Sequence, residues 1–380
     1  MKAAALNDVD DLDTAVYSFP AIRGIQASRE YYSAMVQLKL ISGIFRFNES
    51  EVPAQFRAQR ILNHARIPEI ANYIVSNPKD YVFSSIAASI SDAPVKFVPT
   101  PPDNPNSRVG KIIIPMGARV LINDGQHRRA AIEMALDERP ELGNETISVV
   151  FFIDTGLKRS QQMFSDLNRH AVRPTKSISI LYDSRESFAQ SIRDMASNLP
   201  IFKDLTELEK TSISNRSKKM FTLSTIYQGT AALLGKKTKV KKITKEEEAL
   251  ACEYWNTVAE NIPDWQLLIR GDVASSSLRN NFIHAHGIAF HALGLAGHAL
   301  IEEYPDTWKE RLTILHKIDW SRSNEKVWEG RAMNNGTISK SQMNITLTVN
   351  YLKQIMKLPL SPEETKIEKR FLKQIHGTIQ

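Results

Sequence analysis

The clearest chemistry in this sequence lies in six consecutive residues, Asp124-Gly125-Gln126-His127-Arg128-Arg129. An apolar run precedes them and helical periodicity follows, which predicts the turn between a strand and a helix. Gly125 permits a tight turn, and Asp124 can cap the first free N–H groups of the helix. The helix start and the two arginines favour phosphate, and His127 can relay a proton near neutral pH. We therefore expect a phosphate-binding turn; the alternative is an ordinary capped helix with exposed cations.

A second polar group follows at the end of the next predicted helix. It consists of Asn168, Arg169, His170 and Arg173, just before Pro174. If this loop lies beside the 124–129 turn, an amide and an arginine there could hold a phosphate or a base edge. The alternative is that the cations only complement the negative end of the helix dipole.

Three stretches resemble the DGQHR-domain family, and within it the DndB proteins of DNA phosphorothioation systems. Residues 124–128 spell the motif that names the family, 67–86 look like its helix and strand before the motif, and 161–169 resemble its second motif, Q-x-F-x-D-L-N. The turn also resembles the Gly-Glu-Arg-Arg box of ParB partition proteins and the Gly-Cys-His-Arg turn of sulfiredoxin. In those relatives the turn binds nucleotide phosphates. Gln126 stands where sulfiredoxin has its catalytic cysteine, so peroxiredoxin repair is set aside.

This resemblance implies a DNA-binding transcriptional regulator, a repressor that binds double-stranded DNA upstream of its own gene cluster and restrains DNA sulfur modification. One alternative is an enzyme that binds ATP or another nucleotide with Mg²⁺, in which Asp124 or His127 helps nucleotide hydrolysis or DNA nicking. Asp154 and Asp166 are further carboxylate candidates in that case. A second alternative is a scaffold for the DNA sulfur modification enzymes. Homo-oligomerisation is expected, because symmetric pairs commonly bind operators.

The positive balance also favours an anionic partner, since 49 Lys and Arg residues against 42 Asp and Glu give a net charge of +7. Candidate DNA contacts in the C-terminal half are Arg216, Lys218, Lys219, Lys236, Lys237, Lys239, Lys241 and Lys242. Such cations would make binding salt-dependent. The alternative for the lysine run is a solvated loop balanced by residues 246–248, and residues 223–227 could begin a helix of a helix-turn-helix.

The pattern of elements predicts an α+β fold. A flexible leader (1–14) precedes a DGQHR domain (15–176) with a mixed, ParB/sulfiredoxin-like sheet, and a mainly helical region (177–380) follows. Expected strands are 36–40, 43–47, 81–90, 111–115, 119–122 and 146–153, and expected helices in the first domain are 55–63, 67–77, 126–139 and 156–170.

Several classes of protein are excluded by composition. The single cysteine, Cys252, cannot form an internal disulfide, and the acidic N-terminus is unlike a signal peptide, so we expect a cytoplasmic protein. The longest apolar stretch, 282–300, contains four histidines and three glycines, which indicates a packed helix rather than a membrane span. His284, His291 and His298 recur every seven residues, about 10 Å apart along a helix, so no metal site is expected there.

Overall fold

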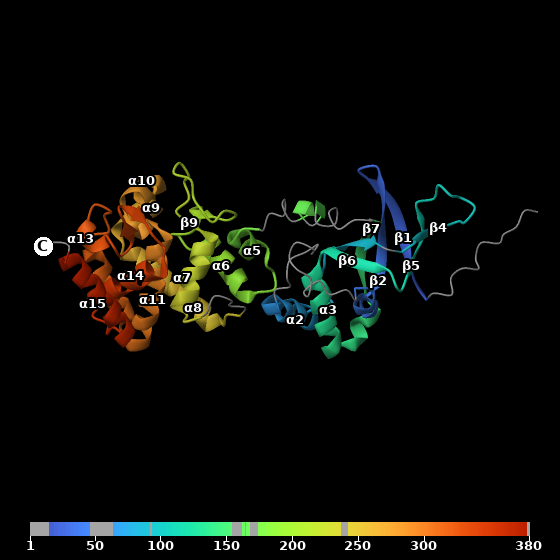
Figure 1. Ribbon diagram of the computed structural model, residues 1–380. Coiled ribbons are helices and arrows are strands. Elements are labelled where there is room, and N and C mark those ends of the chain that lie inside the picture. Colours follow the sequence, from blue (N-terminus) through green and yellow to red (C-terminus); the bar gives the residue numbers. More distant parts are fainter. Residues whose placement is uncertain are drawn as a thin grey trace, which may run out of the picture. The chain divides into compact units, whose positions relative to one another are not determined.

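The chain divides into two compact units, Met1–Val172 and Arg173–Gln380, called here the N-terminal and C-terminal units. The computed structural model describes residues 15–45, 64–91, 93–153, 162–163, 165–167, 174–236 and 242–377 (Figure 1). The expected leader, the expected helix at 55–63 and most of that at 156–170 lie outside the described residues. The expected α+β architecture is confirmed, with the sheet in the N-terminal unit and helices dominating the C-terminal unit.

A seven-stranded sheet forms the N-terminal unit, in the order β4-β5-β1-β2-β7-β3-β6. Its neighbours are antiparallel except for the parallel pair β3 and β7. The strands are β1 (Val16–Gln26), β2 (Arg29–Gln37), β3 (Ile86–Ser91), β4 (Lys96–Pro99), β5 (Val109–Pro115), β6 (Arg119–Asp124) and β7 (Thr146–Ile153).

This sheet must curl, because β5 and β6 follow each other closely in the chain but are separated by four strands in the sheet. In a flat sheet five strand spacings would place them roughly 24 Å apart. The four residue steps from Pro115 to Arg119 reach at most about 14 Å. Curling brings the start of β6 close to the end of β5.

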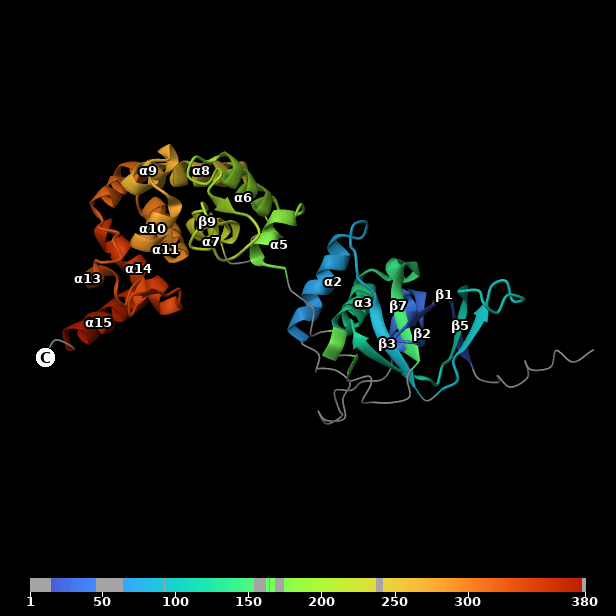
Figure 2. The ribbon, with the colours of Figure 1, turned by 90° about the horizontal axis from the view of Figure 1, so that it is seen from above.

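Two helices cover one face of the sheet. Helices α2 (Ile67–Ser76) and α3 (Gln126–Glu138) lie side by side (Figure 2). Their buried residues, such as Ile74 and Ile132, pack with alternate strand residues, such as Val36 and Val149, into one apolar core. Alternation along each strand is what one covered face requires. The short helices of this unit are η1 (Leu38–Leu40), α1 (Ile41–Ile44), η4 (His64–Arg66) and η5 (Pro140–Asn144).

Three strand predictions, 36–40, 43–47 and 81–90, were wrong over part of their length. Residues 38–44 form η1 and α1 instead of strands, because Leu38, Ile41 and Ile44 are three residues apart and all face the core in a helical path. The segment expected to be a strand from residue 81 becomes one only at Ile86. Before that, backbone groups bond to side chains, as in the N–H of Val82 donating to the Tyr73 hydroxyl at 2.9 Å.

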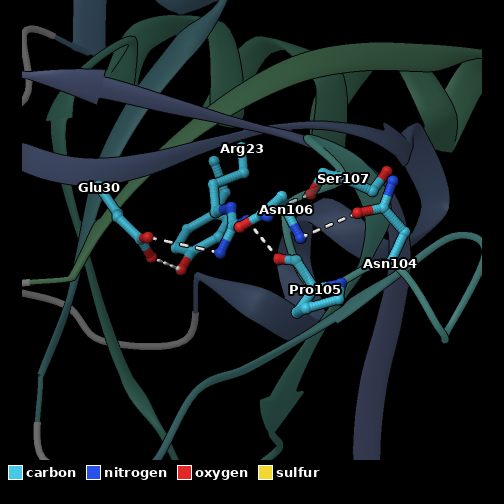
Figure 3. Close-up of polar contacts among 7 residues, drawn as sticks. Arg23, Glu30, Asn104, Pro105, Asn106 and Ser107 are labelled. Carbon is cyan, nitrogen blue, oxygen red and sulfur yellow. Dashed lines mark hydrogen bonds and ion pairs between the residues drawn. The ribbon is translucent and has the colours of Figure 1, made fainter.

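A loop beside β1 is held by a single arginine (Figure 3). Arg23 donates to the carbonyls of Pro105 at 2.9 Å and Ser107 at 3.2 Å, and pairs with Glu30 at 3.4 Å. Its guanidinium also lies 5.1 Å from the centre of the Phe97 ring. The exposed segment 100–106, with its prolines, is therefore a loop with a fixed path.

The C-terminal unit is helical. Its helices are α5 (Lys176–Tyr182), α6 (Ser187–Asn198), α7 (Leu223–Leu233), α8 (Lys245–Glu260), α9 (Pro263–Arg270), α10 (Ser275–Asn281), η6 (Ile283–Ala285), α11 (Gly287–Glu303), α12 (Trp308–Arg311), η7 (Leu312–Lys317), α13 (Glu325–Trp328), α14 (Gln342–Ile355) and α15 (Pro362–Gly377). Two short ladders pair β8 (Thr206–Glu207) with β9 (Phe221–Thr222) and β10 (Met333–Asn334) with β11 (Thr337–Ile338).

Helices α7 and α11 pack closely because glycines remove the side chains between them (Figure 1). A Cβ on Gly294 would lie 2.2 Å from the carbonyl oxygen of Gly229, and one on Gly297 would overlap the Tyr254 ring. Beside them the rings of Trp255 and Phe290 stack with their centres 4.0 Å apart. The packed apolar helix expected within 282–300 is confirmed. No helix in the described part of the chain is long and apolar enough to cross a membrane.

The last helix is attached through a buried ion pair. Arg331 and Glu368 are both buried, and the guanidinium contacts both carboxylate oxygens of Glu368. Arg331 also donates to the carbonyl of Leu347 at 2.8 Å, and Asn350 donates to Glu368 at 3.1 Å. The pair thus joins α14 and α15 to the segment before β10.

Replacing Glu368 with Gln should lower the free energy of unfolding of the C-terminal unit by about 3 kcal/mol, because Arg331 would keep a buried charge without its partner. Urea unfolding followed by tryptophan fluorescence measures this, since all five tryptophans lie between residues 255 and 328. Glu363→Gln, an exposed change in the same helix, is the control and should cost less than about 1 kcal/mol. Equal losses in the two variants would contradict the assignment.

Candidate functional site

The 124–129 motif forms a strand-turn-helix, as predicted. Strand β6 ends at Asp124, Gly125 turns the chain with φ 104° and ψ 12°, and α3 begins at Gln126. This left-handed conformation favours glycine. A Cβ on Gly125 would also lie 3.0 Å from Ile86 and 3.1 Å from Arg128, so the turn leaves little room for a side chain.

The Asp124 side chain does not cap α3, contrary to the prediction. Helix α3 has no side-chain cap, and the Asp124 carboxylate instead pairs with Arg128 at 2.6 Å. Arg128 lies four residues on, one helical turn away, and its full charge competes successfully with the partial charges of the backbone N–H groups. The start of α3 therefore keeps its positive end without a capping carboxylate.

Both arginines of the motif are engaged within the N-terminal unit. Arg128 donates to the carbonyl of Ser84 at 2.9 Å and contacts the Ser84 hydroxyl, and its side chain is only 15% exposed. Arg129 pairs with Glu133 at 2.7 Å, while its buried Nε has no partner among the described residues. Arg128 thus ties the turn to the segment before β3, and a phosphate would have to replace these contacts.

Burial and two basic residues of η4, Arg66 and His64, lower the pKa of His127. Burial lowers the pKa of His127, Arg66 and His64 lower it further, and Asp124 acts in the opposite direction. His64 and Arg66 belong to η4, immediately before α2. These neighbours and burial therefore favour the neutral form of the imidazole.

His64 and Arg66 were missed by sequence reasoning, because they lie about sixty residues before the motif. Their only sequence signal is their position just ahead of the helix that begins Ile67-Pro68. The side chain of Gln126 makes no hydrogen bond with a described residue and is partly exposed. Together the helix start, Gln126, His127, His64 and Arg66 form a polar group, with a positive charge on Arg66, that is suited to an oxyanion. We call it the turn site.

Several other predicted residues cannot be placed. Asn168, Arg169, Arg173 and Asp154 lie outside the described residues, as do Lys237, Lys239 and Lys241. Asp166 is described, and it is exposed and accepts a hydrogen bond from Gln162 at 2.7 Å. The proposed meeting of the 168–173 loop with the turn stays a prediction.

The basic residues of the C-terminal unit differ in how they are held. The side chains of Arg216 and Lys218 are exposed and make no ion pair or hydrogen bond with a described residue. Lys219 donates to the carbonyl of Asp204 at 3.0 Å. Lys236 pairs with Glu247 at 2.6 Å, so for this lysine the balance by the 246–248 acids is observed, and Lys242 is exposed.

One buried arginine fixes the loop that carries Arg216 and Lys218. The guanidinium of Arg279, in α10, donates to the carbonyls of Ser214 at 3.0 Å, Asn215 at 3.2 Å and Ser217 at 2.9 Å, and contacts that of Lys219. The Ser275 hydroxyl, one turn earlier in α10, donates to the carbonyl of Lys218 at 2.7 Å. We call residues 214–219 the basic loop.

Two other sequence hypotheses can be judged. Helix α7 is buried along almost its whole length, so it cannot serve as the exposed helix of a helix-turn-helix. His284 is fully buried, accepts from Trp265 Nε1 at 3.0 Å and contacts Asp264 at 2.9 Å, so it is a hydrogen-bonded core residue. The described residues contain no group of three or more His, Cys, Asp or Glu side chains that could hold a metal ion.

Comparison with known proteins gives one match. The family model DndB, described as DNA-sulfur modification-associated, matches residues 19–359. No curated protein and no solved structure matches the chain. The likeness of the sheet to ParB and sulfiredoxin therefore stays a prediction.

The charges around His127 predict how its titration responds to substitution. Its pKa should lie below the ordinary 6.5, Arg66→Gln should raise it by removing a positive neighbour, and Asp124→Asn should lower it by removing a negative one. Histidine Cε1–H chemical shifts followed by NMR over pH, with the signal assigned by His127→Gln, measure this. Lys111→Gln removes a charge that does not act on His127 and should leave its pKa unchanged. A pKa above 6.5 would refute this account of the turn site.

Proposed function

The chain belongs to the DndB family of DNA-sulfur modification-associated proteins, and from that premise we propose that it is a DNA-binding transcriptional repressor of a phosphorothioate modification gene cluster. It would bind double-stranded DNA upstream of its own cluster and so restrain DNA sulfur modification. Repression needs an ordered surface that contacts the DNA backbone.

The observation that carries this proposal is the basic loop held by Arg279. A buried guanidinium that bonds four carbonyls of one loop holds that loop in one conformation before any ligand arrives. Ordering the loop in advance lowers the entropic cost of binding. Arg216 and Lys218 then present cations to solvent from a fixed backbone, as phosphate contacts require.

The turn site supports the same proposal independently. His64, Arg66 and His127 gather at a helix start without a capping carboxylate, an arrangement that favours a phosphate oxygen. The net charge of +7 adds a long-range attraction to DNA. We further propose a homo-oligomer, because two copies of each basic surface would match a two-fold symmetric operator.

DNA binding by fluorescence anisotropy over a salt series tests the proposal. The wild type should prefer the duplex from upstream of its gene cluster over a scrambled duplex, without ATP or Mg²⁺. The double variant Arg216→Gln/Lys218→Gln should weaken binding to both duplexes and reduce the slope of log K against log salt by about 2. The control Lys317→Gln/Lys326→Gln removes the same charge from exposed positions and should change little.

Other outcomes of this assay would overturn the repressor proposal. Equal, weak binding to the two duplexes would favour a scaffold for the DNA sulfur modification enzymes. Loss of ATP or nicked DNA in the presence of Mg²⁺ would favour a nucleotide hydrolase or nickase that uses Asp124 and His127.

Arg279→Lys separates the order of the basic loop from its charge. A lysine keeps the positive charge but lacks the planar guanidinium that donates to four carbonyls at once. The loop should therefore lose its fixed conformation. DNA affinity should fall about as far as in Arg216→Gln/Lys218→Gln although both exposed cations remain. The same anisotropy assay measures affinity, and hydrogen exchange of residues 214–219 measures order. Faster exchange with unchanged affinity would show that the order of the loop does not contribute.

A further inference from the structure

Lys176, His291 and Lys340 of the C-terminal unit lie near one another, and the two lysines supply the positive charge. No acidic residue contributes to the pKa shift of His291 or Lys340. Burial lowers the pKa of His291 to about 4, and Lys340 and Lys176 lower it further. Burial and Lys176 likewise lower the pKa of Lys340. Lys340 donates to the side-chain oxygen of Gln228 at 2.8 Å, which is a neutral acceptor. We call Lys176, His291 and Lys340 the cationic cluster.

The two lysines of the cluster are reached by solvent and are also partly desolvated. Both are exposed, yet neighbouring protein atoms suffice to lower the pKa of each. His291 adds a buried Nδ1 that has no hydrogen-bond partner among the described residues. The two partly desolvated ammonium groups repel each other, and an anion bound near them would relieve the repulsion.

A polar cavity adjoins the cluster. Its volume is about 390 Å³, and its wall contains Arg279, Arg322, His286 and four hydroxyl-bearing residues but no Asp or Glu. Arg322 donates to the carbonyls of Asn280 at 3.1 Å and Gly336 at 2.8 Å, so its positive charge is not neutralised by these contacts. The interior of the cavity is therefore electropositive.

Thr225 and Gly287 connect the cavity to the cluster. Both line the cavity, and a Cβ on Gly287 would lie 3.2 Å from the Thr225 hydroxyl and 3.5 Å from Lys340 Nζ. Gly287 is the first residue of α11, a seventeen-residue helix without a side-chain cap. The missing side chain leaves the start of α11 accessible between the hydroxyl and the ammonium group.

We propose that this cavity and the cationic cluster form a binding site for a phosphoryl group. The site offers hydrogen-bond donors that point in different directions: Lys340, Lys176, the Thr225 hydroxyl and the start of α11. The several oxygens of a phosphate can accept from all of them, whereas a halide or a carboxylate would leave some donors without an acceptor. The group can come from inorganic phosphate, a nucleotide or the DNA backbone. The cavity shares Asn215 and Arg279 with the basic loop and its support, but the proposal requires neither the turn site nor the repressor role.

Thermal unfolding of the full chain, followed by tryptophan fluorescence, tests the site. Sodium phosphate should raise the Tm by several degrees over sodium chloride at equal ionic strength, because binding to the folded state stabilises it. Lys340→Met should abolish the rise while melting, in chloride, no lower than the exposed control Lys317→Met. Lys317→Met should keep the full rise. If Lys340→Met does not fold, Lys176→Met takes its place under the same criteria.

The proposal is overturned if phosphate raises the Tm of Lys340→Met as much as that of the wild type, or raises the wild type no more than chloride does. Calorimetric titration with inorganic phosphate and AMP, and anisotropy with a scrambled duplex, separate the sources. Loss of AMP binding in Lys340→Met with unchanged DNA affinity identifies a nucleotide. Weaker DNA binding in Lys340→Met, with phosphate competing against DNA in the wild type, identifies the DNA backbone. Arg216→Gln/Lys218→Gln should retain the phosphate effect, so the two proposals can fail separately.

Discussion

A buried cation needs hydrogen-bond acceptors in place of water, and this constraint determines how segments are joined within each unit. Arg279 meets it with four loop carbonyls, Arg331 with the Glu368 carboxylate, and Arg128 with Asp124 and Ser84. In each case the guanidinium joins segments that are distant in sequence or held at a turn. The order of the basic loop, the attachment of α15 and the shape of the motif turn all follow from these contacts.

The same constraint separates structural cations from those available to a ligand. Arg128 was expected to bind phosphate, but the structure uses it to fasten the turn to the segment before β3. Near the start of α3, Arg66 from η4 supplies a positive charge instead. An arginine within a sequence motif can therefore have a structural role, while residues of another element determine the electrostatic potential at the site.

How much the sequence could predict depended on how local each signal was. The strand-turn-helix at 119–138 followed from neighbouring residues, because Gly125 and the change of hydrophobic period lie within a few positions. The strand prediction for residues 38–44 failed because a short apolar segment fits a strand as well as a helical turn. Packing against the core decides between the two. Contacts such as Arg279 with the basic loop join residues about sixty positions apart, and no local pattern encodes them. The β5–β6 connection gave no hint that the two strands belong to distant places in the sheet.

Exposure also determines how each positively charged group depends on salt. Arg216 and Lys218 stand in solvent, where ions screen them over about 8 Å at physiological ionic strength. In the proposed DNA binding their contribution would therefore come largely from counterion release. The cavity wall formed by Arg279, Arg322 and Thr225 is recessed, and charges partly removed from water are screened less. A phosphate held there would persist at salt concentrations that release DNA from the basic loop. Ionic strength therefore distinguishes the two kinds of anion binding within one unit, without any substitution.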